Sequence, residues 1–190
     1  MSLEFSGKQI LIEHVNQAVG AGNPQAITDA LRHALCGLVD REDIRLPQCV
    51  FDYSTEHYCR RLIHHDDRLG YSIMAMTWAP SQGTPIHDHA GMWCVEAVWH
   101  GEIEVHQYEL LERQVERFHL ERRTVMRTGA GSAGSLIPPH EYHTIANPSA
   151  TKPAVTLHIY EGSLDRCSTF LPLENDWYLC ESRALKLDAA

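Results

Sequence analysis

The chain has no hydrophobic run long enough to cross a membrane, and its first residues lack the pattern of a secretory signal. Basic residues are scarce, because 16 lysines and arginines stand against 25 aspartates and glutamates, for a formal net charge of −9. A surface of this sign repels nucleic acids and anionic lipids. We therefore expect a cytoplasmic protein with no nucleic-acid partner and no membrane partner.

The six cysteines of the chain form no CxxC pair. Without a secretion signal, this scatter argues against a disulfide framework and for reduced thiols. The chain also lacks internal repeats, low-complexity stretches and linkers, so that we expect one domain among its 190 residues. The residue in clear excess is histidine, present 13 times, which suggests a metal site.

Two helical segments are predicted between residues 7 and 38, because apolar residues recur there at helical spacing. Between them, Asn23 is a typical N-cap and Pro24 a typical first residue of a helix. We expect residues 1–45 to form a short helical segment that packs on the remainder of the chain.

From about residue 48 the pattern changes to short apolar, aromatic and β-branched runs separated by glycine, proline, serine and aspartate. These runs are 71–78, 84–99, 101–110, 114–127, 133–137, 143–147, 153–161 and 167–172. Many short strands without an intervening helix are typical of an all-β sandwich or barrel. We expect residues 46–190 to form a mainly β unit.

The stretch HDHAGMWC, residues 87–94, contains a candidate pair of metal ligands. Successive side chains of a strand point to opposite faces, so His87 and His89 should project to one side and Asp88 to the other. Two imidazoles can share a metal ion, but at least one further ligand must come from elsewhere in the chain.

The segment GSAGSLIPPHEYHTIAN, residues 131–147, offers His140 and His143 for that role. Together with the HxH pair, it resembles the two motifs of the cupins. In this register His143 is the third ligand, and His140 takes the place of a glycine. The resemblance implies a single jelly-roll-like cupin β-barrel with a metal ion on His87, His89 and His143.

Cys94 stands where most cupins keep a glutamate ligand. We therefore expect a neutral face of three histidines, which leaves a divalent ion its full charge and an octahedral ion three open positions. This suits an anionic, chelating substrate together with O₂, and the related two-histidine-one-carboxylate face is typical of oxygen-activating ferrous sites. Imidazole ligands also suit zinc, copper and nickel, so that the ligands alone do not identify iron.

The sequence from about Tyr58 to Phe170 resembles the thiol dioxygenases, and the cysteine dioxygenase (type I) family in particular. In that family a cysteine can occupy the place of the acidic ligand. The segment YCRRLI matches a tyrosine-x-arginine pattern, which implies that Tyr58 and Arg60 bind the substrate. The segment HTIANPS matches the one that holds the third iron ligand.

The segment AVTLHIY matches a serine-x-histidine-x-tyrosine pattern of the same family, with Thr156 in place of the serine. Because Thr156, His158 and Tyr160 share one strand face, they can form a hydrogen-bonded row that orients the phenol towards the metal. The alternative is an ordinary barrel interior in which the histidine and the tyrosine are buried and satisfied.

The resemblance implies a non-haem Fe(2+) enzyme that oxidises L-cysteine with O₂ to cysteine sulfinic acid, which is a defined step of thiol oxidation. Arg60 would hold the substrate carboxylate through its planar guanidinium, with Tyr58 beside it. Arg61 should point to the opposite face. Cys94 should face Tyr160, and in the family a thioether bond can join these two residues.

Other functions are compatible with the same residues. The substrate could be another small thiol carboxylate, 3-mercaptopropionate or mercaptosuccinate, although relatives that use 3-mercaptopropionate tend to carry glutamine where Arg60 stands. For mercaptosuccinate, Arg61, His64 or His140 could hold the second carboxylate. In another class, the chain would be a non-catalytic or zinc-bound cupin that binds a small ligand. We expect a monomer or a small homo-oligomer.

Overall fold

The computed structural model describes residues 3–189. Two helices, α1 (Lys8–Val19) and α2 (Pro24–Leu38), and a short 3₁₀ turn (Gln48–Phe51) precede the strands. The strands are β1 (Cys59–Asp66), β2 (Tyr71–Trp78), β3 (Ile86–His87), β4 (Cys94–His100), β5 (Glu102–Arg113), β6 (Arg117–Gly129), β7 (Ala133–Leu136), β8 (His143–Ala146), β9 (Ala154–Tyr160), β10 (Arg166–Pro172) and β11 (Trp177–Ala184). The predicted mainly β fold with N-terminal helices is confirmed.

Both helices form where the sequence predicts them. The side chain of Asn23 accepts a hydrogen bond from the backbone N–H of Ala26 at 3.0 Å, which caps α2, and Pro24 is its first residue. The apolar stripes of the two helices are buried at positions such as Leu11 and Leu35. Amphipathic packing of this kind, rather than intrinsic propensity, is the main source of stability for short helices.

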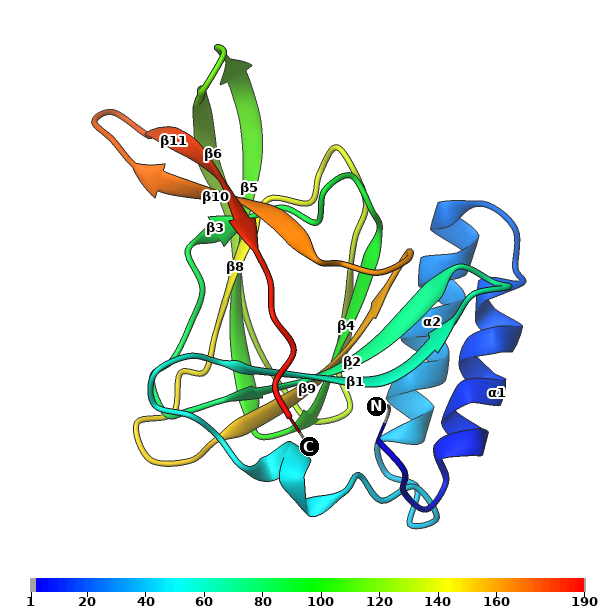
Figure 1. Cartoon of the computed structure of the whole chain (residues 1–190). Helices are drawn as coiled ribbons and strands as arrows, with labels where there is room; N and C mark the ends of the chain where they lie inside the picture. Colours follow the sequence, from blue (N-terminus) through cyan, green and yellow to red (C-terminus); the bar gives the residue numbers. More distant parts are fainter. Residues whose placement is uncertain (1–2, 190) are drawn as a thin grey trace.

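The strands form two antiparallel sheets. One has five strands in the order β1-β2-β9-β4-β7, and the other six close on themselves in the order β10-β11-β6-β5-β8-β3. Figure 1 shows the two helices together on one side of the β region, with the β5–β6 hairpin projecting away from it. The short strands β3 and β8 of the closed sheet and the strands β4 and β9 of the open sheet carry the candidate site residues.

Strand alternation divides the five-stranded sheet into a helix face and an interior face. Val95 and Leu157 belong to the hydrophobic cluster that includes the helices, whereas Cys94, Val98 and Tyr160 belong to a separate cluster on the other face. Since neighbours in a strand point to opposite faces, even-numbered residues of β4 and β9 point into the barrel. This parity positions the functional side chains.

The predicted strand over residues 84–99 is wrong in its middle, because it is divided into β3 and β4. Ala90 and Gly91 adopt left-handed backbone conformations with φ of 54° and 81°, which end the extended run. His89 therefore lies in the loop after β3 and not on the same strand as His87. The prediction also lacks β1 and β11; the side chains of β11 are partly or fully exposed, which gives this strand a weak apolar pattern.

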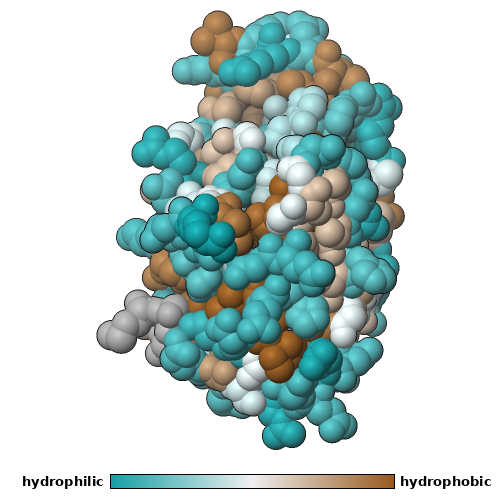
Figure 2. All heavy atoms as spheres, turned by 90° about the vertical axis from the view of Figure 1, so that its right-hand side faces the viewer, coloured by the Kyte–Doolittle hydropathy of each residue, from teal (hydrophilic) through white to brown (hydrophobic). Residues whose placement is uncertain are grey.

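Within residues 3–189, no helix is both long enough and apolar enough to cross a membrane. Figure 2 shows the side of the molecule that carries the helices, where hydrophilic residues cover most of the surface and hydrophobic areas are smaller and separate. The residues that the five-stranded sheet contributes to the candidate site lie on its other face, which points into the barrel.

Candidate metal centre

The three predicted ligands come together in the barrel. His87 and His143 are directly paired across β3 and β8, and His89 reaches them from the following loop. The ring centroids are 4.2 Å apart for His87 and His143, 5.0 Å for His89 and His143, and 5.5 Å for His87 and His89. One nitrogen of each ring lies within 4.8 Å of the other two, whereas His140 is exposed at the surface.

Hydrogen bonds orient two of these imidazoles. Nδ1 of His87 lies 3.2 Å from the carbonyl oxygen of Pro85, and Nδ1 of His143 lies 2.8 Å from that of Glu141. An Nδ1–H that donates to a carbonyl leaves Nε2 as the free nitrogen, which is the usual arrangement of metal-binding histidines. The backbone carbonyl two residues before each ligand therefore sets its tautomer.

His89 fits a metal ion best of all. Its side chain is fully buried, and neither ring nitrogen has a hydrogen-bond partner. A buried polar atom without a partner costs about 1–3 kcal/mol. A metal ion bound to His87, His89 and His143 would give one of these two nitrogens a partner. The residues present therefore fit a transition-metal ion.

The electrostatics also favour ligation. Burial and the neighbouring His143 lower the pKa of His87 to about 3. The same causes, in the same order, hold the pKa of His89 well below its usual value. Because an imidazole must be deprotonated to bind a metal, both residues are ready to ligate at neutral pH.

A buried glutamate that the sequence analysis did not include lies next to His143. Oε1 of Glu96 lies 3.2 Å from Nε2 of His143 and 3.2 Å from Nδ1 of His158. The side chain has only 9% of its surface exposed. Burial acts to raise the pKa of Glu96, but the two histidines outweigh it and hold this pKa well below the usual range.

The sequence analysis missed Glu96 because the spacing of the cupin motif places the acidic ligand at position 94, although a pattern in the sequence indicates Glu96. Cys94 occupies the acidic position of the motif, and Glu96 is two residues further along β4. Residues two apart in a strand share a face, so a side chain at 96 enters the same space as one at 94. A lone glutamate in the otherwise apolar run CVEAVW is the pattern that predicts it.

The predicted row of residues forms along β9 and extends to β2. Nε1–H of Trp78 donates to Oγ1 of Thr156 at 2.9 Å, and Oγ1 lies 2.7 Å from Nε2 of His158. The threonine hydroxyl therefore donates to Nε2, which leaves the proton of His158 on Nδ1. Nδ1 lies 3.1 Å from the Tyr160 hydroxyl and also faces Glu96.

Cys94 and Tyr160 lie side by side next to the histidines. They are paired residues of β4 and β9, and the Tyr160 ring is 5.4 Å from that of His89. Burial, and then the charge of Glu96, hold the pKa of Cys94 well above its usual value, against the effect of a hydrogen bond with Tyr160. Burial likewise raises the pKa of Tyr160, whose phenol is therefore protonated at neutral pH.

Arg60 lies on β1, and Tyr58 is the residue before this strand. Arg60 is 4% exposed, and its guanidinium donates to the carbonyl oxygens of Leu164 at 2.9 Å and Lys186 at 3.4 Å. The positive charge of Arg60 acts to lower the pKa of both tyrosines, although burial prevails and raises it. Arg60 also lines a small pocket of about 120 Å³.

Arg61 points elsewhere, as the strand alternation predicts. Its guanidinium donates to Oγ1 of Thr77 at 3.2 Å and to the carbonyl oxygen of Asp52 at 2.9 Å. Tyr58, by contrast, stacks on Trp78 with the ring centroids 4.9 Å apart. Tyr58 and Arg60 are therefore on the side of the sheet that faces the histidines, and Arg61 is not.

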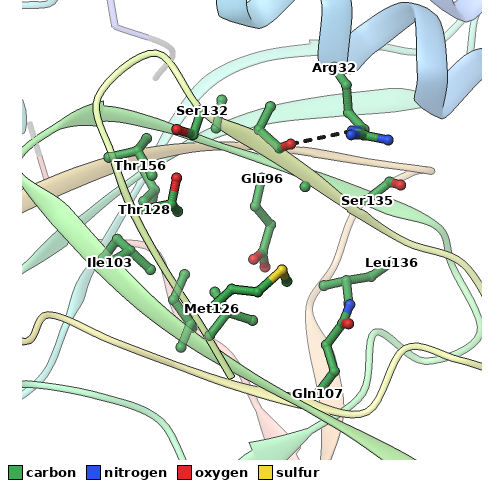
Figure 3. Close-up of a pocket in the computed structure, with 16 residues that line it drawn as sticks. Arg32, Glu96, Ile103, Gln107, Met126, Thr128, Ser132, Ser135, Leu136 and Thr156 are labelled. Carbon is green, nitrogen blue, oxygen red and sulfur yellow. Dashed lines mark hydrogen bonds between the residues drawn. The ribbon is translucent and has the colours of Figure 1, made fainter. Parts of the chain in front are cut away.

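Glu96 forms part of the wall of a cavity that none of the three histidines lines. It has a volume of about 300 Å³, and its apolar lining includes Val98, Ile103, Val105, Met126, Leu136 and Ile145. Figure 3 shows the Glu96 side chain extending among these residues, while Arg32 of α2 donates a hydrogen bond at the edge, to the carbonyl oxygen of Ala133 at 3.3 Å. Thr156 also lines the cavity.

Comparisons with known proteins agree with this geometry. Residues 48–171 match the family model "Cysteine dioxygenase type I". Cysteine dioxygenase type 1 is 25% identical over 114 residues in Rattus norvegicus, 26% over 115 residues in Danio rerio and 24% over 113 residues in Homo sapiens. Each alignment covers 60% of this chain and 55% of the relative, so that the chain spans about half the length of the curated relatives it matches.

A solved structure supports the fold independently. The chain is similar to an uncharacterised conserved protein with a double-stranded β-helix domain from Klebsiella pneumoniae, with a TM-score of 0.50 and 16% identity. That match covers 74% of this chain and 99% of the other. The double-stranded β-helix is the barrel of the cupins, which confirms the predicted fold class. With its family model matched over most of the β region, this chain belongs to the cysteine dioxygenase type I family.

Proposed function

We propose that this protein is a thiol dioxygenase that holds Fe(2+) on His87, His89 and His143 and oxidises L-cysteine with O₂ to cysteine sulfinic acid. The observation that carries the proposal is the fully buried His89, which has no hydrogen-bond partner and lies between two other imidazoles and Tyr160. When bound, ferrous iron supplies the redox chemistry that joins O₂ to a thiolate.

Tyr160 would act as a hydrogen-bond donor beside the reacting atoms. Its raised pKa keeps the phenol protonated. The hydroxyl lies 3.1 Å from Nδ1 of His158 and donates to Sδ of Met76 at 3.7 Å, a weak acceptor that a more polar partner at the metal centre would replace. Thr156 and Trp78 hold His158 in the tautomer that this role needs. A preorganised donor of this kind stabilises developing negative charge without a reorganisation cost.

Arg60 and Tyr58 would bind the substrate carboxylate. The guanidinium of Arg60 is bonded to two backbone carbonyl oxygens, and a carboxylate is a stronger acceptor than either of them. Tyr58 is held against Trp78 on the same side of the sheet. The positive charge of Arg60 and the negative charge of Glu96 would orient an amino acid, whose carboxylate and ammonium groups differ in sign.

The charge of Glu96 also bears on the choice of thiol. A carboxylate that stays ionised beside the histidines favours a substrate with an amine, such as L-cysteine, over mercaptosuccinate with its second carboxylate. It favours L-cysteine over 3-mercaptopropionate as well, because the latter has no amine to pair with it.

The test is a metal analysis of the purified protein followed by oxygen-electrode traces with a panel of thiols. We expect iron to support oxygen uptake with L-cysteine and sulfinate to accumulate, with weaker uptake for 3-mercaptopropionate and mercaptosuccinate. Fast turnover of either of these two and not of L-cysteine would assign another substrate within the same class. A zinc-loaded protein that consumes no oxygen with any thiol, even after exchange to iron, would instead indicate a ligand-binding cupin.

A further inference from the structure

We propose that Glu96 is a fourth ligand of the metal centre, supplied from a position two residues beyond the acidic position of the cupin motif. This inference deepens the function proposed above. It rests on the metal centre described there, but not on the identity of the thiol.

The distance between Glu96 and His143 is the one that two ligands of the same ion would have. Nε2 of His143 is the nitrogen that points away from the backbone, and it lies 3.2 Å from Oε1 of Glu96. Two ligand atoms bound at right angles, each about 2.1 Å from a metal ion, are about 3.0 Å apart. The carboxylate oxygen is therefore within reach of an ion bound to His143.

A second relationship points to the same ion. A carboxylate oxygen of Glu96, a ring nitrogen of His89 and Sγ of Cys94 all lie within 4.8 Å of one another. Glu96 therefore contacts His143 at 3.2 Å and lies within 4.8 Å of His89, a second member of the three-histidine cluster.

The architecture of β4 explains how the carboxylate arrives there. Cys94 and Glu96 share the interior face of the strand, opposite Tyr160 and His158 of β9 respectively. The short side chain of Cys94 leaves space next to the histidines, and the longer side chain of Glu96 reaches into that space. In this chain a small residue at position 94 and a carboxylate at position 96 take the place of a carboxylate at position 94.

A purely structural role for Glu96 fits less well. Oε1 of Glu96 lies 3.2 Å from Nε2 of His143 and 3.2 Å from Nδ1 of His158. A metal ion on Nε2 of His143 would take the place of the first contact and put a divalent cation within reach of the carboxylate. Opposite charges attract strongly in a buried site, so the carboxylate should bind that ion.

Glu96 also has space to withdraw. It borders the cavity of about 300 Å³, as Figure 3 shows, whereas His89 and His143 are fully enclosed. Glu96 would therefore be the ligand able to move towards the cavity when a chelating thiol occupies the site.

The test uses Co²⁺ as a probe in the full chain freed of metal. Its affinity is measured by calorimetry and its ligand set by visible absorption. The variants are Glu96→Gln, which removes the charge, and Glu96→Asp, which keeps the charge but is one methylene shorter. The matched control is Glu104→Gln, because Glu104 pairs with His106 at 2.8 Å on β5, outside the three-histidine cluster.

We expect both Glu96 variants to weaken Co²⁺ binding at least about tenfold and to alter the absorption spectrum, with Glu104→Gln unchanged. If Glu96→Asp, or both Glu96 variants, bind Co²⁺ with the wild-type affinity and spectrum, Glu96 is not a ligand. L-cysteine added to Co²⁺-loaded wild type should shift its spectrum towards that of Glu96→Gln with the same thiol. The Co²⁺ experiment measures metal binding and not oxygen uptake. If the iron-loaded wild type turned over no thiol in a separate assay, the proposed function would be overturned, whereas the assignment of Glu96 as a ligand would stand.

Discussion

Cys94 and Tyr160 face each other directly across the antiparallel strands β4 and β9, with both side chains buried beside His89. This pairing brings together the two residues that the family resemblance links through a thioether bond. The nearby phenol also acts to lower the pKa of the Cys94 thiol, against the larger effect of burial, which raises it.

The first prediction is that turnover with iron, O₂ and L-cysteine joins Cys94 to Tyr160 in part of the molecules. A new bond from Sγ to the ring removes one hydrogen from each residue, and O₂ accepts the two hydrogens. The intact mass should fall by two hydrogen atoms in wild type but not in Cys94→Ala or Tyr160→Phe. If robust turnover leaves the wild-type mass unchanged, Cys94 only fills space beside the histidines.

The second prediction separates the two histidines of the second motif. His143→Ala should abolish iron retention, because it removes a buried ligand that no neighbour can replace. His140→Ala should retain iron, because His140 is exposed and lies outside the cluster. Metal content per chain after desalting measures both. The reverse pattern would show that the ligand register is wrong.

The third prediction concerns the substrate carboxylate. Arg60→Gln should lower kcat/KM for L-cysteine roughly ten- to a hundredfold, since a charged hydrogen bond is worth about 1.5–3 kcal/mol. Cysteamine, which has no carboxylate, should be affected much less. Arg60 also holds the backbone at Leu164 and Lys186, so thermal unfolding of the variant should be measured in parallel. Equal losses with both thiols would reduce Arg60 to a structural role.

The fourth prediction tests the hydrogen-bonded row on β9. Thr156→Val removes the hydroxyl that bonds to Nε2 of His158 and accepts from Trp78, and it leaves both groups buried without a partner. We expect the free energy of unfolding to fall by about 1–3 kcal/mol for each unpaired group, measured in urea. Thr156→Ser keeps the hydroxyl and should restore most of the loss. A stable Thr156→Val would contradict the row.

The fifth prediction is a pH dependence of the metal-free protein. His87 has a pKa of about 3 in the folded state against 6.5 for an ordinary histidine, so between these values the unfolded chain binds more protons. The stability is therefore present above about pH 6.5 and is lost as the pH falls, by about 1.4 kcal/mol per unit for this residue.

The matched comparison for this pH effect uses urea unfolding at several pH values between about 4 and 7. His87→Asn should reduce the slope of stability against pH, and His140→Asn at the exposed position should leave it unchanged. Identical slopes for wild type and His87→Asn would exclude a neutral His87 in the folded state.

Local sequence patterns predicted much of this protein. The capping of α2 by Asn23 and the alternating apolar runs are short-range features, because helix caps and strand faces depend on neighbours in the chain. The same alternation correctly predicts that Arg60 and Arg61 separate and that Thr156, His158 and Tyr160 line up. Motif spacing likewise indicated which histidines could share one metal ion.

Tertiary structure decided what depends on contacts between distant segments. The loop that carries His89 bends through left-handed residues, yet pairing of β3 with β8 still brings its imidazole to His87 and His143. Glu96 reaches the histidines only because β4 pairs with β9, which places Glu96 opposite His158 and next to His143. A sequence motif specifies only the spacing of residues along the chain. Which groups a carboxylate can contact depends on the pairing of distant strands, and this pairing exists only in the folded structure.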